Sequence, residues 1–139
     1  DMCFEGANFD RIQELLPENM HYLCYSGITI DGVLFWGIPL SINDSIDGSY
    51  REKLALMPPK IDVLISHSPP YGILDESGNI NYGCPDLLQK VLEIKPKLHL
   101  FGHTHAAYGS DKSRNTAFFN AAITNDDYLI VNEPFKIDL

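Results

Sequence analysis

Two histidines, His103 and His105, follow an apolar run and are separated by a single residue. The run and the histidines read Leu-His-Leu-Phe-Gly-His-Thr-His over 98–105. In an extended chain the side chains of residues i and i+2 point the same way, so both imidazoles would leave the strand end toward one point. Imidazole is the commonest metal-binding side chain and accepts Zn, Fe, Mn and Ni. The spacing therefore favours a metal site at the end of this strand.

A third histidine, His67, follows a second apolar run over 61–66. That run is short and rich in β-branched residues, which predicts a buried strand. Between the two runs, 85–94 predicts a helix, because Pro-Asp opens it, one face is apolar and Lys-Pro follows it. The order strand, helix, strand is typical of a parallel crossover. The carboxyl ends of both strands would then share the edge where α/β sheets bind ligands, and all three histidines would meet there.

The rest of the chain predicts short elements around this unit, and the whole is α/β in class. An Asp-Gly turn at 31–32 favours a hairpin between its flanking strands. Glycine and polar residues over 71–83 indicate a surface loop. The remaining expected elements are helices over 11–16 and 50–57, strands over 21–25, 28–30, 33–38 and 97–101, and short antiparallel strands over 116–121, 128–131 and 135–137.

Composition limits the classes of function. The chain has 139 residues, 45% of them hydrophobic, which is enough for one packed domain or a large piece of one. Its formal net charge of -9 excludes general nucleic-acid binding, which needs excess Lys and Arg. No apolar segment reaches the roughly 18 residues that a membrane span requires. Three widely spaced cysteines predict neither a disulfide framework nor a zinc knuckle, so we expect a reducing, cytoplasmic setting.

Several polar residues have simpler interpretations. His99 alternates with leucines inside its strand, and His21 lies beside a turn, so both are expected to be structural. The serines beside His67 belong to no G-x-S-x-G elbow, which argues against a nucleophilic serine. Four acidic residues could supply carboxylates, but their spacing matches no calcium loop, and we expect them to be solvated. They are Asp44, Asp47, Asp75 and Glu76.

Two stretches resemble the last two motifs of the calcineurin-like metallophosphoesterase family. The first is Ser-His-Ser-Pro-Pro over 66–70, a histidine after a strand, and the second is G-H-x-H over 102–105. The form of the first, continued by Tyr-Gly over 71–72, is similar to the subgroup of small metallophosphoesterase-domain proteins. The family's earlier motifs, D-x-H, G-D and G-N-H-[D/E], are absent, although Asp1 resembles the last position of the third. The resemblance implies that 1–139 is a single domain, the carboxyl-terminal portion of a metallophosphoesterase domain.

The same resemblance implies a fold and a metal site. The family's fold is a four-layer α-β-β-α sandwich in which mixed β-sheets are flanked by helices. The complete protein would hold two divalent metal ions, Mn, Fe, Zn or Ni, and this chain alone at most one weakly bound ion. By position, His67 and His103 would ligate the second metal and His105 the first. Asp1 would at most contact these ligands and would not bind a metal ion itself. The family's catalytic histidine would lie outside this chain.

The activity implied is hydrolysis of a phosphomonoester or phosphodiester by a metal-bound hydroxide. The substrate would be a small phosphoester, and a nucleotide is one candidate because Tyr71, Tyr82 and Tyr108 could stack on a base. The chain alone would be weak or inactive, and a missing amino-terminal half or a second copy would cover its exposed sheet. Two alternatives stay open: a non-catalytic truncated module, and a hydrolase that uses the three histidines to hold one zinc ion.

Overall fold

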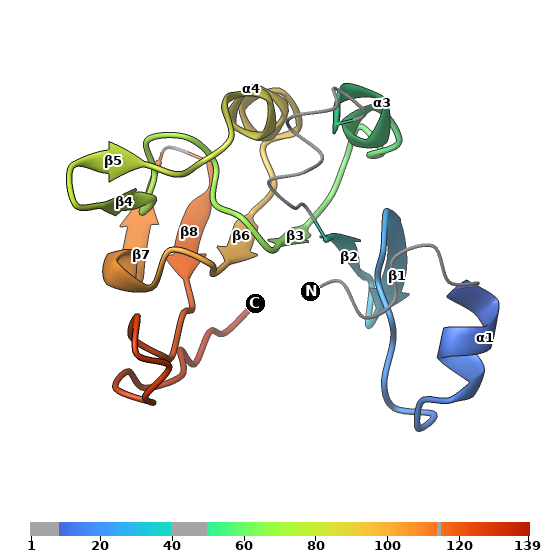
Figure 1. Ribbon diagram of the computed structural model, residues 1–139. Coiled ribbons are helices and arrows are strands. Elements are labelled where there is room, and N and C mark those ends of the chain that lie inside the picture. Colours follow the sequence, from blue (N-terminus) through green and yellow to red (C-terminus); the bar gives the residue numbers. More distant parts are fainter. Residues whose placement is uncertain (1–8, 40–49, 114) are drawn as a thin grey trace.

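The computed structural model describes residues 9–39, 50–113 and 115–139. Within these ranges a six-stranded sheet has the order β1-β2-β3-β6-β8-β7 (Figure 1). Four central strands run parallel, and β1 and β7 lie antiparallel at the two edges. The strands are β1 (Ser26–Ile30), β2 (Val33–Ile38), β3 (Val63–Ser66), β6 (Leu98–Phe101), β7 (Gly109–Lys112) and β8 (Ala117–Asn120).

Helices α3 and α4 cover the same face of this sheet, and the chain after β8 runs on the opposite side (Figure 1). A small separate hairpin lies in the loop that follows β3. The elements outside the main sheet are α1 (Phe9–Glu14), α3 (Tyr50–Ala55), α4 (Pro85–Ile94), the 3-10 turn η1 (His105–Ala107), β4 (Glu76–Ser77) and β5 (Ile80–Asn81). No helix in these described ranges is long and apolar enough to cross a bilayer.

The crossover β3–α4–β6 was expected from the sequence, and the structure confirms it. The two strands are adjacent and parallel, with Val63 opposite Leu98. The connecting helix begins after Cys84, whose side chain accepts a hydrogen bond from the Leu87 N–H, and ends at Lys95 in a left-handed conformation. This left-handed cap is a common way to stop a helix, and the following proline cannot continue it.

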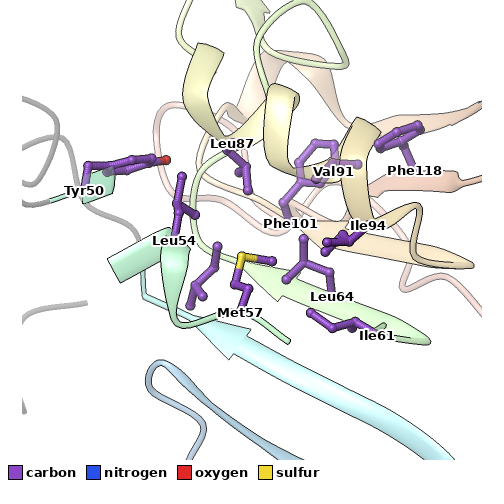
Figure 2. Close-up of a cluster of buried hydrophobic side chains, with 11 residues drawn as sticks. Tyr50, Leu54, Met57, Ile61, Leu64, Leu87, Val91, Ile94, Phe101 and Phe118 are labelled. Carbon is purple, nitrogen blue, oxygen red and sulfur yellow. The ribbon is translucent and has the colours of Figure 1, made fainter. Parts of the chain in front are cut away.

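An apolar cluster joins the helices to the sheet (Figure 2). From α4 it takes Leu87 and Val91, and from the strands it takes Leu64 and Phe118, all at 1% exposure or less. Each such side chain contributes roughly 1.5–3 kcal/mol when it leaves water. The cluster is Ile38, Tyr50, Leu54, Met57, Ile61, Leu64, Leu87, Val91, Ile94, Phe101 and Phe118. It fixes the positions of β3 and β6, and therefore of the residues at their carboxyl ends.

The structure corrects several expected strands. The segment 117–120 is a strand that pairs antiparallel with β7 on one side, but on its other side it runs parallel to β6. The segment 128–131 contributes only an isolated bridge between Thr124 and Ile130, and 21–25 and 135–137 form no strand. Alternation of apolar residues marks an extended chain but does not select its partner or direction. The hairpin at 31–32 is confirmed.

Candidate functional site

His67 and His103 face each other at the carboxyl ends of β3 and β6. The Nε2 atom of His67 lies 3.0 Å from the Nδ1 atom of His103, and the ring centroids are 4.7 Å apart. The backbone continues the sheet at this point, since the Gly102 N–H donates to the His67 carbonyl at 3.1 Å. Two strands that lie side by side therefore bring together two histidines that are 36 positions apart in the sequence.

The turn that carries His103 and His105 is not extended. His103 has a φ of 67°, in the left-handed region that residues other than glycine rarely adopt. The Thr104 N–H then donates to the Gly102 carbonyl at 2.8 Å, and the 3-10 turn η1 begins at His105. The expectation of an extended chain at these two histidines is therefore wrong, although both of them line the same cavity. A tight reversal directs them instead.

Both imidazoles of the facing pair are favoured in the neutral form. Burial lowers the pKa of His67, and the neighbouring His103 lowers it further. Burial also lowers the pKa of His103, with an added contribution from His105. Positive charge is disfavoured on a partly buried ring that faces another titratable ring. A neutral imidazole keeps a lone pair, which is the form that binds a metal.

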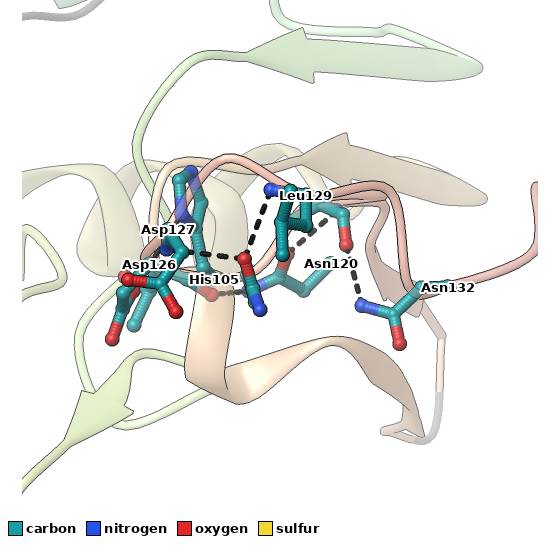
Figure 3. A network of polar contacts seen from close by, with 9 residues as sticks. His105, Asn120, Asp126, Asp127, Leu129 and Asn132 are labelled. Atoms are coloured by element: carbon teal, nitrogen blue, oxygen red, sulfur yellow. Dashed lines mark hydrogen bonds and ion pairs between the residues drawn. The ribbon is translucent and has the colours of Figure 1, made fainter.

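His105 lies beside Asp126 (Figure 3). Its Nδ1 atom is 3.5 Å from the Asp126 carboxylate, and the Tyr128 ring packs edge-on against it at 5.5 Å. A cavity of about 270 Å³ opens beside this turn. The residues that line it are Ser77, Tyr82, His103, Thr104, His105 and Asp126. Of the three tyrosines considered from the sequence, Tyr82 alone is among them.

The facing pair fits two ligand positions of one metal ion. Two nitrogens that each lie about 2.1 Å from an ion are about 3 Å apart at the right angle of octahedral coordination and about 3.4 Å apart at the tetrahedral angle of zinc sites. The separation of 3.0 Å between His67 and His103, which is also that of a hydrogen bond, lies near this range. In the described part of the chain no three His, Cys, Asp or Glu side chains gather closely enough to hold an ion. The metal roles of His67, His103 and His105 stay predictions, and Asp1 lies outside the described residues.

The structural interpretation of His99 agrees with its surroundings. Its side chain is completely buried, and its Nε2 atom lies 2.8 Å from the Ser66 hydroxyl. That hydroxyl donates its hydrogen to the Ser68 carbonyl at 2.7 Å, so His99 must be the donor in the contact with Ser66. Burial lowers the pKa of His99 to about 3. The hydroxyl of Ser66 is buried and engaged, which also argues against a nucleophilic serine.

Asp75 is a correction to the sequence analysis. It was expected to be solvated, but its side chain is only 2% exposed. Its carboxyl oxygens accept hydrogen bonds from the N–H groups of Gly72 and Gly83, both at 2.9 Å, and from the Asn81 amide at 2.7 Å. Glu76, its neighbour, is exposed as expected. Asp44 and Asp47 lie outside the described residues.

Sequence reasoning missed Asn120, which is completely buried at the carboxyl end of β8. Its side-chain amide contacts the carbonyl of Thr104, between the two histidines of the turn (Figure 3). The available signal was an asparagine that ends an apolar strand, as His67 and His103 follow theirs. A polar residue at that place in a third parallel strand indicates the same sheet edge.

Similarity to curated proteins supports a metallophosphoesterase-like family for this chain. A UPF0046 protein of Caenorhabditis elegans is 42% identical over 125 residues, which are 84% of this chain and 42% of that protein. Metallophosphoesterase domain-containing protein 1 of Homo sapiens is 35% identical over an alignment of 142 residues, covering 95% of this chain and 43% of that protein. The chain thus spans less than half the length of these two relatives. A comparison with protein-family models finds no match.

A solved crystal structure supports the fold independently. It matches 71% of this chain and 44% of its own, with a TM-score of 0.51 and 17% sequence identity. This likeness shows that the mixed parallel and antiparallel sheet flanked by helices is a fold shared with a solved protein. The α/β class predicted from the sequence is confirmed, and the four-layer arrangement stays a prediction.

Proposed function

We propose that the protein containing this chain is a metal-dependent hydrolase of small phosphoesters, and that these residues supply part of its metal centre. The observation that carries the proposal is the facing pair of His67 and His103, at the carboxyl ends of adjacent parallel strands in a metallophosphoesterase-like chain. The lowered pKa values of both rings support it, because neutral imidazoles are metal ligands. When bound, divalent ions supply the Lewis acidity that phosphoester hydrolysis requires.

Each of the described site residues would have its own role in such a metal centre. His67 and His103 would hold one ion, and His105 would offer its ring from the cavity side of the turn. The cavity of about 270 Å³ gives a phosphoester room beside the rings of His103 and His105, and Tyr82 also lines it. The remaining ligands, including those of a second Mn, Fe, Zn or Ni ion, would come from residues outside the described ranges. We place the protein in the cytoplasm, in keeping with its few, widely spaced cysteines.

The test uses the natural protein that contains these residues, together with His67→Ala and His103→Ala variants. We expect bound divalent metal in the natural protein by elemental analysis, and hydrolysis of p-nitrophenyl phosphate or its bis ester. Both variants should lose metal and hydrolysis together. The matched control is His21→Ala, because His21 is exposed and lies outside the facing pair and the cavity.

Two outcomes would replace the proposal. A natural protein that holds no metal and hydrolyses neither ester is a non-catalytic module. One tightly bound zinc ion per chain, with full activity in residues 1–139 alone, would instead indicate a mononuclear hydrolase that uses the three histidines.

A further inference from the structure

Asn120 connects three segments of the chain by hydrogen bonds of its side chain. Its Nδ2 atom donates two hydrogen bonds, to the Thr104 carbonyl at 2.8 Å and to the Leu74 carbonyl at 3.0 Å. Its Oδ1 atom accepts the Ala122 N–H at 3.1 Å. The three segments are the turn with the histidines, the loop after β3, and the chain that leaves β8. The side chain is completely buried, so water does not compete for these bonds.

Two of these segments contain residues in the left-handed conformation. Leu74 has a φ of 49° and His103, next to Thr104, has a φ of 67°. A residue other than glycine pays free energy for such a value, and it persists where the surrounding structure over-determines it. Asn120 bonds the carbonyl of Leu74 itself and the carbonyl one residue beyond His103. It is therefore placed to stabilise both turns at once.

The arrangement selects for an amide side chain. Two carbonyl oxygens need two hydrogens from one atom, and the Ala122 N–H needs an acceptor on the other branch, which is the donor and acceptor set of asparagine. An aspartate of the same shape would keep the acceptor but set a carboxyl oxygen against the carbonyls of Leu74 and Thr104. Asn120→Asp therefore removes the two donated bonds with little change in volume.

We propose that Asn120 is a positioning residue, which holds the 103–105 turn against the loop at Leu74 so that the His103 ring faces His67. The separation of 3.0 Å between their nitrogens would then depend on an amide in a third strand. The consequence for metal affinity rests on the proposed function, whereas the consequence for the geometry of the imidazoles does not.

The test compares the natural protein with Asn120→Asp by NMR of 15N-labelled histidine in the metal-free state, followed by titration with Zn²⁺. In the natural protein we expect ring signals of His67 and His103 from one hydrogen-bonded arrangement. In the variant we expect these signals to shift and average. We also expect zinc affinity to fall about tenfold or more, which is the range seen when groups that hydrogen-bond to metal ligands are removed.

The matched control is Asn132→Asp. Asn132 donates its amide to the Ala122 carbonyl at 2.9 Å, so the change removes a bond of the same kind from the same segment without touching the histidine turn. Unchanged histidine signals in Asn120→Asp, or equal changes in both variants, would overturn the proposal. If Asn120→Asp does not fold, Asn120→Ser, which keeps one donor, is measured instead. A natural protein that binds no zinc would contradict the proposed function, while the metal-free spectra would still decide the role of Asn120.

Discussion

The same two strands carry two polar pairs with opposite properties. Ser66 and His99 lie inside the sheet and are almost completely buried, with contacts of 2.8 and 2.7 Å to one another and to the Ser68 carbonyl. His67 and His103, at the ends of these strands, contact each other, and His103 also lines a cavity. Ser66 of the interior pair and His67 of the edge pair are consecutive residues, at the end of β3 and just beyond it.

The difference lies in which groups complete each pair. The interior pair is bonded within the fold through the Ser66 hydroxyl and the His99 Nε2 atom, whereas the buried His99 Nδ1 atom has no hydrogen-bond partner among the described residues. We expect the value of this pair to be structural, so its removal should change stability. The edge pair consists of two partly buried rings that contact each other, and one of them, His103, sits in a disfavoured backbone conformation. Backbone strain of this kind concentrates at functional sites. Edge substitutions should therefore change binding and spare stability, and interior substitutions should do the reverse.

The largest effect that would sharpen this comparison is expected from His103→Gly. The variant should lower metal affinity and phosphoester hydrolysis by about a hundredfold or more. Removing a metal ligand should cost more affinity than removing a group that only hydrogen-bonds to a ligand. It should not destabilise the fold, because glycine adopts a φ of 67° without the steric cost of about 1–2 kcal/mol that other residues carry. Zinc titration and urea unfolding of the metal-free protein measure the two effects. The control, His103→Ala, should lose the same affinity but be less stable than the glycine variant.

A smaller effect, and one on stability, is expected from Asp75→Ala. The change leaves the N–H groups of Gly72 and Gly83 and the Asn81 amide without their acceptor in a buried place. Hydrogen bonds to a charged group are each worth about 1.5–3 kcal/mol, and partial rearrangement of the loop should limit the total loss to about 2–4 kcal/mol. Urea unfolding measures this loss. Glu76→Ala, at the exposed neighbour, should change stability by less than about 0.5 kcal/mol, and an equal loss there would contradict the assignment.

His99 should make stability depend on pH. Its folded pKa of about 3 lies below the value near 6.5 of an unfolded histidine, so the unfolded chain takes up the proton first. Stability therefore falls as the pH drops below about 6.5, by about 1–2 kcal/mol between pH 7 and pH 5. In His99→Phe this part of the acid sensitivity should disappear, because the phenyl ring carries no proton. Unfolding curves at both pH values test it, and an unchanged pH dependence would show that His99 does not remain neutral.

Local sequence pattern predicted the elements that position the site. The β-branched run before His67, the proline that opens α4 and the apolar run before Gly102 each carry their own signal, and together they fix a parallel crossover. The hairpin at 31–32 followed in the same way from its Asp-Gly turn. These features depend on neighbours in the sequence, so the sequence is sufficient for them.

Pairings between distant segments were harder to predict. Nothing near Asn120 indicates that β8 lies beside β6 in parallel, and its two carbonyl partners are 16 and 46 positions away. Asp75 looked solvated because its loop is polar, although the backbone of that loop folds around it. The left-handed turn at His103 could not be predicted for a related reason, because Asn120, which bonds this turn, belongs to another strand. Sequence patterns report local conformation, whereas these features depend on tertiary hydrogen bonds.

The smallest effect that would test the comparison is expected from Asp126→Asn. The carboxylate of Asp126 lies 3.5 Å from His105, but the Asp126 side chain is 79% exposed. Exposed contacts of this kind contribute about 0–1 kcal/mol, and salt weakens them. The variant should therefore lose less than about 0.5 kcal/mol of stability in urea unfolding, and the difference should shrink between 50 and about 500 mM NaCl. Asp127→Asn is the matched control. A stability loss above about 2 kcal/mol would show that the contact of His105 with Asp126 is structural, like that of the interior pair. The proposed difference between edge and interior would then not hold at His105.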